Sequence, residues 1–185
     1  MLAACLLALA CLAPATASAT DGGVTASQAG GVAPDGRFLP TAKAKLVNGF
    51  AVAPSSAPQS VKNIIAAANS IATKPYRYGG GHKSFIDTAY DCSGSVSFAL
   101  KGANLLTSPL DSSSFMRWGK RGRGRWVTVY TNPGHAFMVV AGLRFDTGYR
   151  GWSRAAAIGQ APGSGPRWGA PRPTTGFTAR SPLGL

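Results

Sequence analysis

The sequence predicts an α+β fold in which helices pack on one side of a small antiparallel β-sheet. Two helical patterns come first, within residues 58–72 and 91–101. Three strand-like runs separated by short turns then lie within residues 126–147, which is typical of an antiparallel meander. Helices followed by neighbouring strands indicate the α+β class. At 185 residues, the chain has room for one domain of ordinary size and tails.

The N-terminal segment has the composition of a secretory signal peptide. Residues 1–19 contain no charge, are mostly Ala and Leu, and end in a small-x-small pattern, Ala-Ser-Ala. We expect cleavage after Ala19, although the positively charged start typical of such signals is missing. The alternative, a lipoprotein signal, needs Cys5 or Cys11 as the lipidated residue. Either reading places the mature protein outside the cytoplasm, secreted or in the cell envelope (periplasm or cell wall), with no transmembrane segment of its own.

Composition divides the remaining chain into three parts. Residues 20–57 are rich in Gly, Ala, Pro and Ser and have no long periodic stretch, so they predict a flexible linker. The folded domain is expected over residues 58–150. Residues 151–185 predict a C-terminal tail rich in Gly, Pro and Arg that has no clear element of its own. Its candidate anchors to the domain are Trp152, Trp168 and Phe177.

The first predicted helix begins near Ser56 and ends before Pro75. Ser56 offers a capping hydroxyl, and Pro58 is suited to the first turn of a helix. The helix should bury one face against the sheet or the second helix. Its apolar stripe consists of Val61, Ile64, Ile65, Ala68, Ile71 and Ala72.

The second predicted helix begins at Cys92, the one cysteine beyond residue 19. Asp91 is expected to cap it, and Gly102 to end it in the left-handed conformation. A helix start favours an anion, hence the thiolate, which is the nucleophilic form of cysteine. Free cysteines are also common as inert core residues. A lone thiol in an exported protein nevertheless favours a reactive role.

A glycine-rich loop, residues 76–82, joins the two helices. Its three consecutive glycines permit positive φ and close backbone approach. The loop lacks the G-x-x-x-x-G-K-[ST] pattern of a phosphate-binding loop, so that function is excluded. We expect its backbone to pass close to another segment, with the turn before Cys92 as the nearest candidate.

A strongly basic balance characterises the chain, which has a net charge of +13 and six acids, all of them Asp. Its densest basic run lies within residues 117–126, after a short helix that Asp111 is expected to cap. The run is either a solvated loop or a contact for polyanions such as anionic cell-wall polymers. Nucleic acid is not expected as a partner, because helix-turn-helix, zinc-binding and RNA-binding aromatic motifs are missing.

A thiol nucleophile needs a base and a group that orients the base. His135 opens the middle strand of the meander directly after a turn, which is a rigid place to present a side chain. His82 lies in the glycine-rich loop and is less well fixed, so we prefer His135. The alternative role for His135 is a strand-edge residue bonded to a backbone carbonyl.

Asp146 is the candidate for the orienting group. If residues 141–142 form a two-residue turn, Asp146 becomes the diagonal neighbour of His135 on one face of the meander. A three-residue turn would reverse that relation. The alternative for Asp146 is an ordinary ion pair with Arg144.

Three motifs resemble those of the NlpC-type cell-wall endopeptidases, a family of papain-like cysteine peptidases. Residues 75–80 are similar to the family's Pro-Tyr-x-aromatic-Gly-Gly motif, residues 91–94 (Asp-Cys-Ser-Gly) to its nucleophile motif, and residues 134–135 (Gly-His) to its base motif. The resemblance covers roughly residues 61–146. The Pro-Gly-Asp-Leu segment that usually precedes the base strand is absent, and the third residue of the family is often His, where this chain has Asp.

The resemblance implies a papain-like fold and hydrolysis of peptidoglycan stem peptides, at the bond between γ-D-glutamate and the diamino acid. It implies no cofactor, and two distant histidines with one cysteine do not form a zinc-binding pattern. Two alternatives stay open: an amidase or acyltransferase with the same Cys-His site, and a non-catalytic basic wall-binding protein. The implied site consists of Cys92 as nucleophile, His135 as base, Asp146 as third residue, and Tyr76, Tyr78 and Ser93 as substrate-binding residues.

Overall fold

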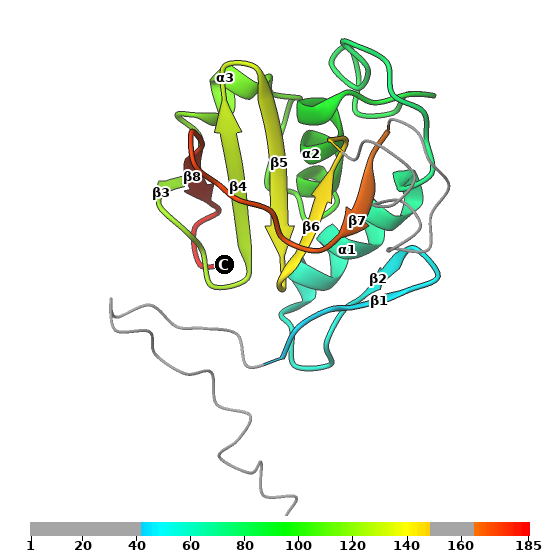
Figure 1. Ribbon diagram of the computed structural model, residues 1–185, viewed down its shortest axis with the longest axis vertical. Helices are drawn as coiled ribbons and strands as arrows, with labels where there is room; N and C mark the ends of the chain where they lie inside the picture. Colours follow the sequence, from blue (N-terminus) through cyan, green and yellow to red (C-terminus); the bar gives the residue numbers. More distant parts are fainter. Residues whose placement is uncertain (1–41, 149–164) are drawn as a thin grey trace, which may run out of the picture.

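The computed structural model describes residues 42–148 and 165–185, which form the predicted α+β fold. Six antiparallel strands form one sheet in the order β3-β8-β4-β5-β6-β7, and helices α1 and α2 lie on one side of it (Figure 1). The helix that begins at Cys92 packs on this sheet, as the papain-like resemblance implies. The predicted signal peptide lies outside the described residues.

The helices and strands have the following bounds. The helices are α1 (Gln59–Ile71), α2 (Cys92–Lys101) and α3 (Ser112–Phe115). The strands are β1 (Lys45–Val47), β2 (Phe50–Val52), β3 (Lys120–Arg121), β4 (Val127–Asn132), β5 (His135–Val140), β6 (Leu143–Asp146), β7 (Arg167–Gly169) and β8 (Thr178–Ser181). None of the helices in the described ranges is long and apolar enough to cross a membrane.

Helix α1 buries the predicted apolar stripe. Val61, Ile64 and Ala68 are fully buried in the core, as the 3.6-residue periodicity predicts. The predicted cap at Ser56 was wrong: Pro58 occupies the N-cap position, and no side chain caps the helix.

Helix α2 packs closely against α1 at its C-terminal end. Gly102 is its C-cap but has φ −56°, so the predicted left-handed conformation was wrong. The glycine has a different reason: a Cβ at this position would lie 2.4 Å from the Cβ of Ala67 on α1. Gly102 therefore allows the two helices to approach one another.

The register of the meander follows from its two tight turns. Asn132 pairs with His135 across the first turn, and Val140 pairs with Leu143 across the second. Ala141 and Gly142 both have positive φ, 46° and 86°, as in a two-residue turn that matches the twist of the strands. The predicted two-residue turn is confirmed.

Part of the predicted linker is ordered structure. Strands β1 and β2 form a hairpin, which the Asn69 side chain ties to α1 by accepting from Ala51 N (3.0 Å) and donating to Ala51 O (2.9 Å). The flexible-linker interpretation of residues 20–57 was therefore wrong for residues 45–52. Each of these strands has only three residues, too few for a periodic pattern to be visible.

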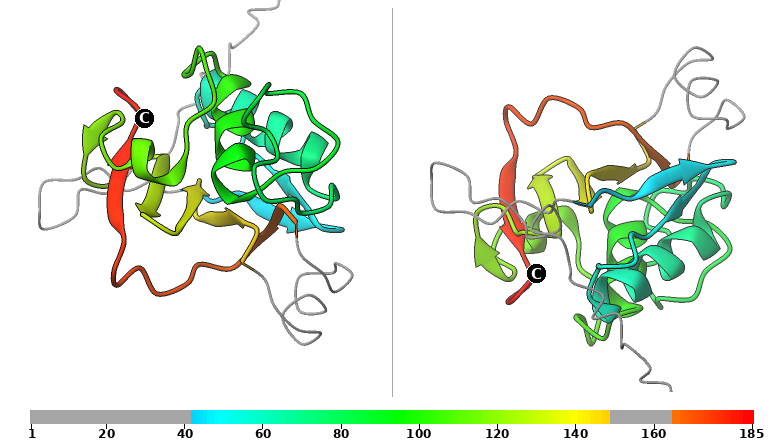
Figure 2. Two further views of the ribbon diagram at one scale, coloured as in Figure 1. Left: turned by 90° about the horizontal axis from the view of Figure 1, so that it is seen from above. Right: turned by 90° about the horizontal axis from the view of Figure 1, so that it is seen from below.

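The described part of the predicted tail also belongs to the sheet. Strand β8 pairs with both β3 and β4, and β7 pairs with β6. The expectation that this region has no element of its own was wrong, and the domain extends beyond residue 150. The proposed anchor Trp168 is fully buried, whereas Trp152 lies outside the described residues. The connection between β7 and β8 crosses the sheet face that lies opposite α1 and α2 (Figure 2).

Candidate active site

Asp91 organises the start of helix α2. Its Oδ1 accepts from Gly94 N at 2.7 Å as the predicted helix cap, and its Oδ2 accepts from Gly79 N at 3.0 Å. Cys92 is the first residue of the helix and is partly exposed. The thiol thus sits at the positive end of the helix dipole.

The glycine-rich loop packs against this helix start through backbone atoms. Gly80 O accepts from Asp91 N at 3.1 Å, and a Cβ at Gly94 would lie only 2.0 Å from Gly80 O. Gly79 and Gly81 have positive φ, 74° and 80°. The expected close approach of the loop to the cysteine turn is therefore confirmed.

His135 and Asp146 meet across neighbouring strands. His135 lies at the start of β5 and Asp146 at the end of β6, and His135 Nε2 is 2.8 Å from Asp146 Oδ1. The Asp146 side chain is completely buried, whereas that of His135 is 24% exposed. Because Nε2 contacts the carboxylate, Nδ1 is the ring nitrogen left to interact with the Cys92 side chain, which is close enough to influence the pKa of His135. The structure thus brings the three predicted residues together.

His135 and Asp146 each shift the pKa of the other. Burial lowers the pKa of His135, but hydrogen bonds to Asp146 and Cys92 and the charge of both partners outweigh it and raise the pKa to about 9. Burial raises the pKa of Asp146, but the hydrogen bond and charge of His135 bring it below its ordinary value. The arrangement favours a protonated imidazole beside an ionised carboxylate at neutral pH.

Asp146 has further partners besides His135. Its Oδ1 also accepts from Gly148 N at 2.8 Å, and its Oδ2 lies 3.2 Å from Arg144 Nη1 and 3.4 Å from Arg172 Nη1. The predicted alternative, an ion pair with Arg144, therefore exists together with the bond to His135. Arg172 was missed in the sequence, because it lies in the supposed tail, where no pattern distinguishes it from other arginines.

A cleft of about 300 Å³ opens beside Cys92. The predicted substrate-binding residues Tyr76, Tyr78 and Ser93 all line it. Tyr78 is 89% exposed. Burial and, next, the charge of Cys92 raise the pKa of Tyr76, so its phenol stays protonated at neutral pH. The other lining residues are Gly79, His82, Asp91, Cys92, Asp111, Ser112, Pro133 and Gly134.

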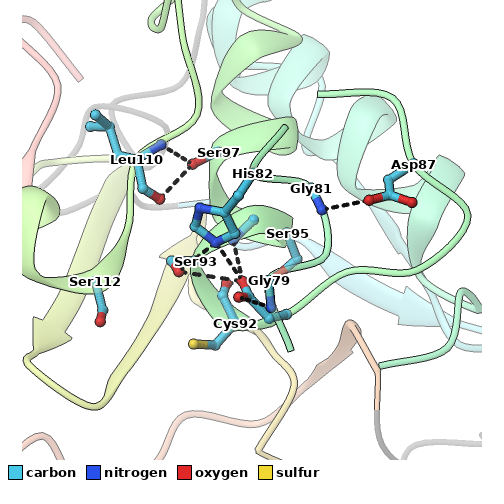
Figure 3. A network of polar contacts seen from close by, with 12 residues as sticks. Gly79, Gly81, His82, Asp87, Cys92, Ser93, Ser95, Ser97, Leu110 and Ser112 are labelled. Atoms are coloured by element: carbon cyan, nitrogen blue, oxygen red, sulfur yellow. Dashed lines mark hydrogen bonds and ion pairs between the residues drawn. The ribbon is translucent and has the colours of Figure 1, made fainter. Parts of the chain in front are cut away.

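His82 belongs to a separate polar network in the cleft wall. Its Nε2 lies 2.9 Å from Asp91 Oδ1 and 3.2 Å from Ser93 Oγ. Figure 3 shows this network at the start of α2, with the sulfur of Cys92 directed away from it. His82 thus supports the helix cap, a role that the sequence did not indicate. Across residues 42–148 and 165–185, no three His, Cys, Asp or Glu side chains are grouped so that they could hold a metal ion.

Comparisons with known proteins find similarity at the level of structure. No protein-family model matches the chain, and no curated protein sequence matches it. The chain is similar to the peptidoglycan hydrolase RipB from Mycobacterium tuberculosis, with 17% identity, coverage of 70% of this chain and 68% of RipB, and a TM-score of 0.48. It is also similar to RipD from the same organism, a non-catalytic NlpC/p60 domain protein adapted to peptidoglycan binding, with 18% identity, 69% and 100% coverage, and a TM-score of 0.47.

These structural neighbours are NlpC/p60 domain proteins. They come from the family whose motifs the sequence resembles. A third neighbour, a hypothetical invasion protein of M. tuberculosis, is 22% identical over 66% of this chain, with a TM-score of 0.45, and the chain spans 62% of its length. At such identities the likeness concerns the fold, and the function has to be argued from the site.

Proposed function

We propose that this protein is a cysteine peptidase that hydrolyses amide bonds in peptidoglycan stem peptides at the cell envelope. One observation carries the proposal: His135 joins the thiol of Cys92, at a helix start, to the buried carboxylate of Asp146. A nucleophile, a base within hydrogen-bonding reach and a group that orients the base are the parts that nucleophilic catalysis requires. The Cys-His-Asp order along the chain agrees with the resemblance to the NlpC-type endopeptidases.

The reaction uses these parts in two steps. The Cys92 thiolate attacks the carbonyl carbon of the amide, and the C–N bond breaks while His135 gives its proton to the leaving amine. This leaves a thioester on sulfur. A water molecule then attacks the thioester as His135 takes up one of its protons, and the S–C bond breaks, which releases the acid and restores the thiolate beside protonated His135. The Cys92 backbone N–H and the protonated phenol of Tyr76 are candidate donors to the oxyanion.

The cleft suits a short polar peptide as substrate. Its lining combines the aromatic rings of Tyr76 and Tyr78 with the polar side chains of His82, Asp111 and Ser112. Such a mixture of aromatic and ionisable groups matches stem peptides, which carry carboxylates and amines on a short chain. We adopt the γ-D-glutamyl bond to the diamino acid, which the resemblance implies, as the bond to be tested first.

Purified muropeptides, with products identified by mass spectrometry, provide the test. We expect the protein to cleave within the stem peptide and the Cys92→Ala variant to be slower by at least about 10⁴-fold. Ser70→Ala, an exposed change on α1, controls for handling and is expected to cleave normally. Cleavage between sugar and peptide, or transfer to an added amine, would instead support the amidase or acyltransferase alternative. Retention on peptidoglycan without any cleavage would support the non-catalytic binding alternative and contradict the proposal.

We further propose that the basic loop, residues 117–125, holds the protein on anionic wall polymers. Arg117, Lys120, Arg121, Arg123 and Arg125 are all exposed. The acids of the described residues are engaged elsewhere: Asp87 with Arg77, Asp91 with His82, Asp111 as the cap of α3, and Asp146 with His135. The loop therefore presents a positive surface whose attraction to polyanions depends on salt.

Neutralising this loop should weaken wall binding without slowing catalysis. A variant with Lys120, Arg121 and Arg123 changed to Gln is expected to bind insoluble cell wall several-fold more weakly at low salt. Its cleavage of small soluble muropeptides in 0.1 M salt should stay within about twofold, because screening at this salt concentration limits the reach of exposed charges to about 10 Å. The matched control changes Lys62, Lys74 and Lys83 to Gln, which removes the same charge elsewhere. Equal losses in both variants would show that net charge alone matters and would contradict a specific role for the loop.

A further inference from the structure

The connection between β7 and β8 covers the His135–Asp146 pair with two side chains. Arg172 places Nη1 3.4 Å from Asp146 Oδ2, and its guanidinium lies over the rings of Phe137 and Phe177, at 5.5 and 5.7 Å from their centroids. The Phe177 ring meets the His135 ring edge-on, with centroids 6.3 Å apart and an interplanar angle of 71°. A cation stacked on two aromatic faces is held firmly in position.

The cover is closely fitted to the pair beneath it. The Phe137 and Phe177 rings also contact each other edge-on at 5.1 Å. A Cβ added at Gly148 would lie 3.1 Å from both Arg172 Nη1 and Asp146 Oδ1. The carboxylate of Asp146 is completely buried under this cover. The Arg172 side chain is 33% exposed, but the carboxylate it contacts is buried, and charges near a buried group interact more strongly than charges in water, so the charge of Arg172 acts on the pair.

We propose that Arg172 and Phe177 form a cap over the His135–Asp146 pair, in which Arg172 acts through Asp146 to promote proton release from His135. The inference rests on the proposed function, because it assigns these residues to the same reaction. It differs from that function by placing part of the active site in the connection between β7 and β8, which none of the sequence motifs includes.

Arg172 acts through charge rather than by orienting the carboxylate. Asp146 Oδ1 is already fixed by His135 and by Gly148 N, and Oδ2 lies 3.2 Å from Arg144 Nη1. The longer contact with Arg172 adds little further restraint. It does place a second positive charge, after that of Arg144, beside the carboxylate that stabilises protonated His135. The carboxylate then stabilises the imidazolium less, so His135 donates its proton more readily to the leaving amine.

Several charged or titratable groups of the described residues surround His135 and influence its titration. These are the Cys92 thiol from α2, Asp146 and Arg144 from β6, and Arg172 from the connection after β7. Tyr76 acts more remotely, through its interaction with Cys92. Of these groups, Arg172 is the one that can be neutralised without removing a proposed reacting group or the buried arginine on β6.

The test compares Arg172→Met, which removes the charge but keeps an apolar stem, with Arg172→Lys, which keeps the charge. The pH dependence of Cys92 alkylation by iodoacetamide is followed by peptide mass spectrometry, and the titration of His135 by NMR. We expect Arg172→Met to move the His135 titration upward by about 0.5–1 pH unit, and Arg172→Lys to leave it near the original position. The kcat for muropeptides at neutral pH should fall several-fold in Arg172→Met with little change in KM.

Controls separate this inference from simpler explanations. Arg121→Met removes the same charge from exposed strand β3 and should not move the titration. If Arg172→Met does not fold, Arg172→Gln replaces it and should give the same upward shift. No shift, a downward shift, or an equal shift in Arg172→Lys or Arg121→Met would overturn the inference. Alkylation and NMR need no substrate, so they test the effect of Arg172 on His135 independently of peptide cleavage. If the expected shift is seen in a protein that cleaves no peptide, the effect of Arg172 is supported and the proposed function is refuted.

Discussion

Replacing Asp146 with asparagine is expected to slow peptide cleavage by about 10²–10⁴-fold. The amide cannot satisfy the partners of the carboxylate in either orientation. If its NH₂ group faces His135 and Gly148, this donor meets the Gly148 N–H, which is also a donor. The NH₂ group also requires Nε2 of His135 to accept a hydrogen bond, so the neutral imidazole would carry its proton on the other ring nitrogen. If the NH₂ group faces the other way, it meets the guanidinium groups of Arg144 and Arg172, which can only donate hydrogen bonds. The imidazolium also loses the negative charge that stabilises it.

The same substitution should lower the free energy of unfolding by about 3 kcal/mol, because it removes one charge from a buried ionic cluster. This loss depends on pH. The folded pKa of His135, about 9, lies above its ordinary value of 6.5, so its contribution is complete below about pH 6.5 and disappears as the pH rises through 9. The folded pKa of Asp146 is lowered, so its contribution is present above its ordinary value of about 3.8 and disappears as the pH falls. The difference between wild type and variant should therefore be largest between about pH 4 and 6.5.

Urea unfolding across this pH range and muropeptide cleavage at neutral pH provide the measurements. Asp87→Asn, at the partly exposed ion pair with Arg77, serves as the matched control and should retain most of the cleavage rate. An Asp146→Asn variant that cleaves at the wild-type rate, with an unchanged His135 titration, would exclude Asp146 as the orienting group.

Replacing Gly94 with alanine is expected to destabilise the fold by about 3 kcal/mol or more. Helix propensity alone predicts the opposite sign, since alanine is favoured over glycine within a helix by about 1 kcal/mol. The steric effect dominates because the new Cβ would lie 2.0 Å from the backbone oxygen of Gly80. Backbone cannot rotate away as a side chain can, so the glycine-rich loop must separate from α2.

The displaced loop should also reduce cleavage, because Gly80 holds the Asp91 backbone beside Cys92. Thermal unfolding and iodoacetamide reactivity of Cys92 would measure the two effects. Gly134→Ala is the matched control for stability, because its Cβ would meet nothing closer than Asn132 Oδ1 at 3.8 Å. Equal stability of Gly94→Ala and wild type would show that the loop can move at little cost.

For Asp91, His135 and Asp146, the sequence could indicate a partner because that partner is close along the chain. The cap of α2 by Asp91 involves Gly94, three residues away, and the approach of His135 to Asp146 follows from two adjacent strands and one tight turn. Local spacing determines both. The stripe on α1 is likewise visible because 13 residues give several helical turns.

The features missed from the sequence depend on contacts between distant segments. Strand β8 has four residues and pairs with β4, although β5, β6 and β7 lie between the two strands in the chain. Arg172 reaches Asp146 only because β7 and β8 flank that part of the sheet, and Gly102 is explained by Ala67 on another helix. Neither composition nor periodicity encodes such pairings.

The order of strands has a consequence for contacts between molecules. Unpaired strand edges invite the addition of strands from other chains, which leads to aggregation. In this sheet the outermost strands are β3 and β7, of two and three residues, and they carry Lys120, Arg121 and Arg167. The two six-residue strands, β4 and β5, are both interior. At the six-stranded sheet of the described residues, a second copy of the protein therefore meets short, positively charged edge strands, which disfavour the growth of a continuous intermolecular sheet.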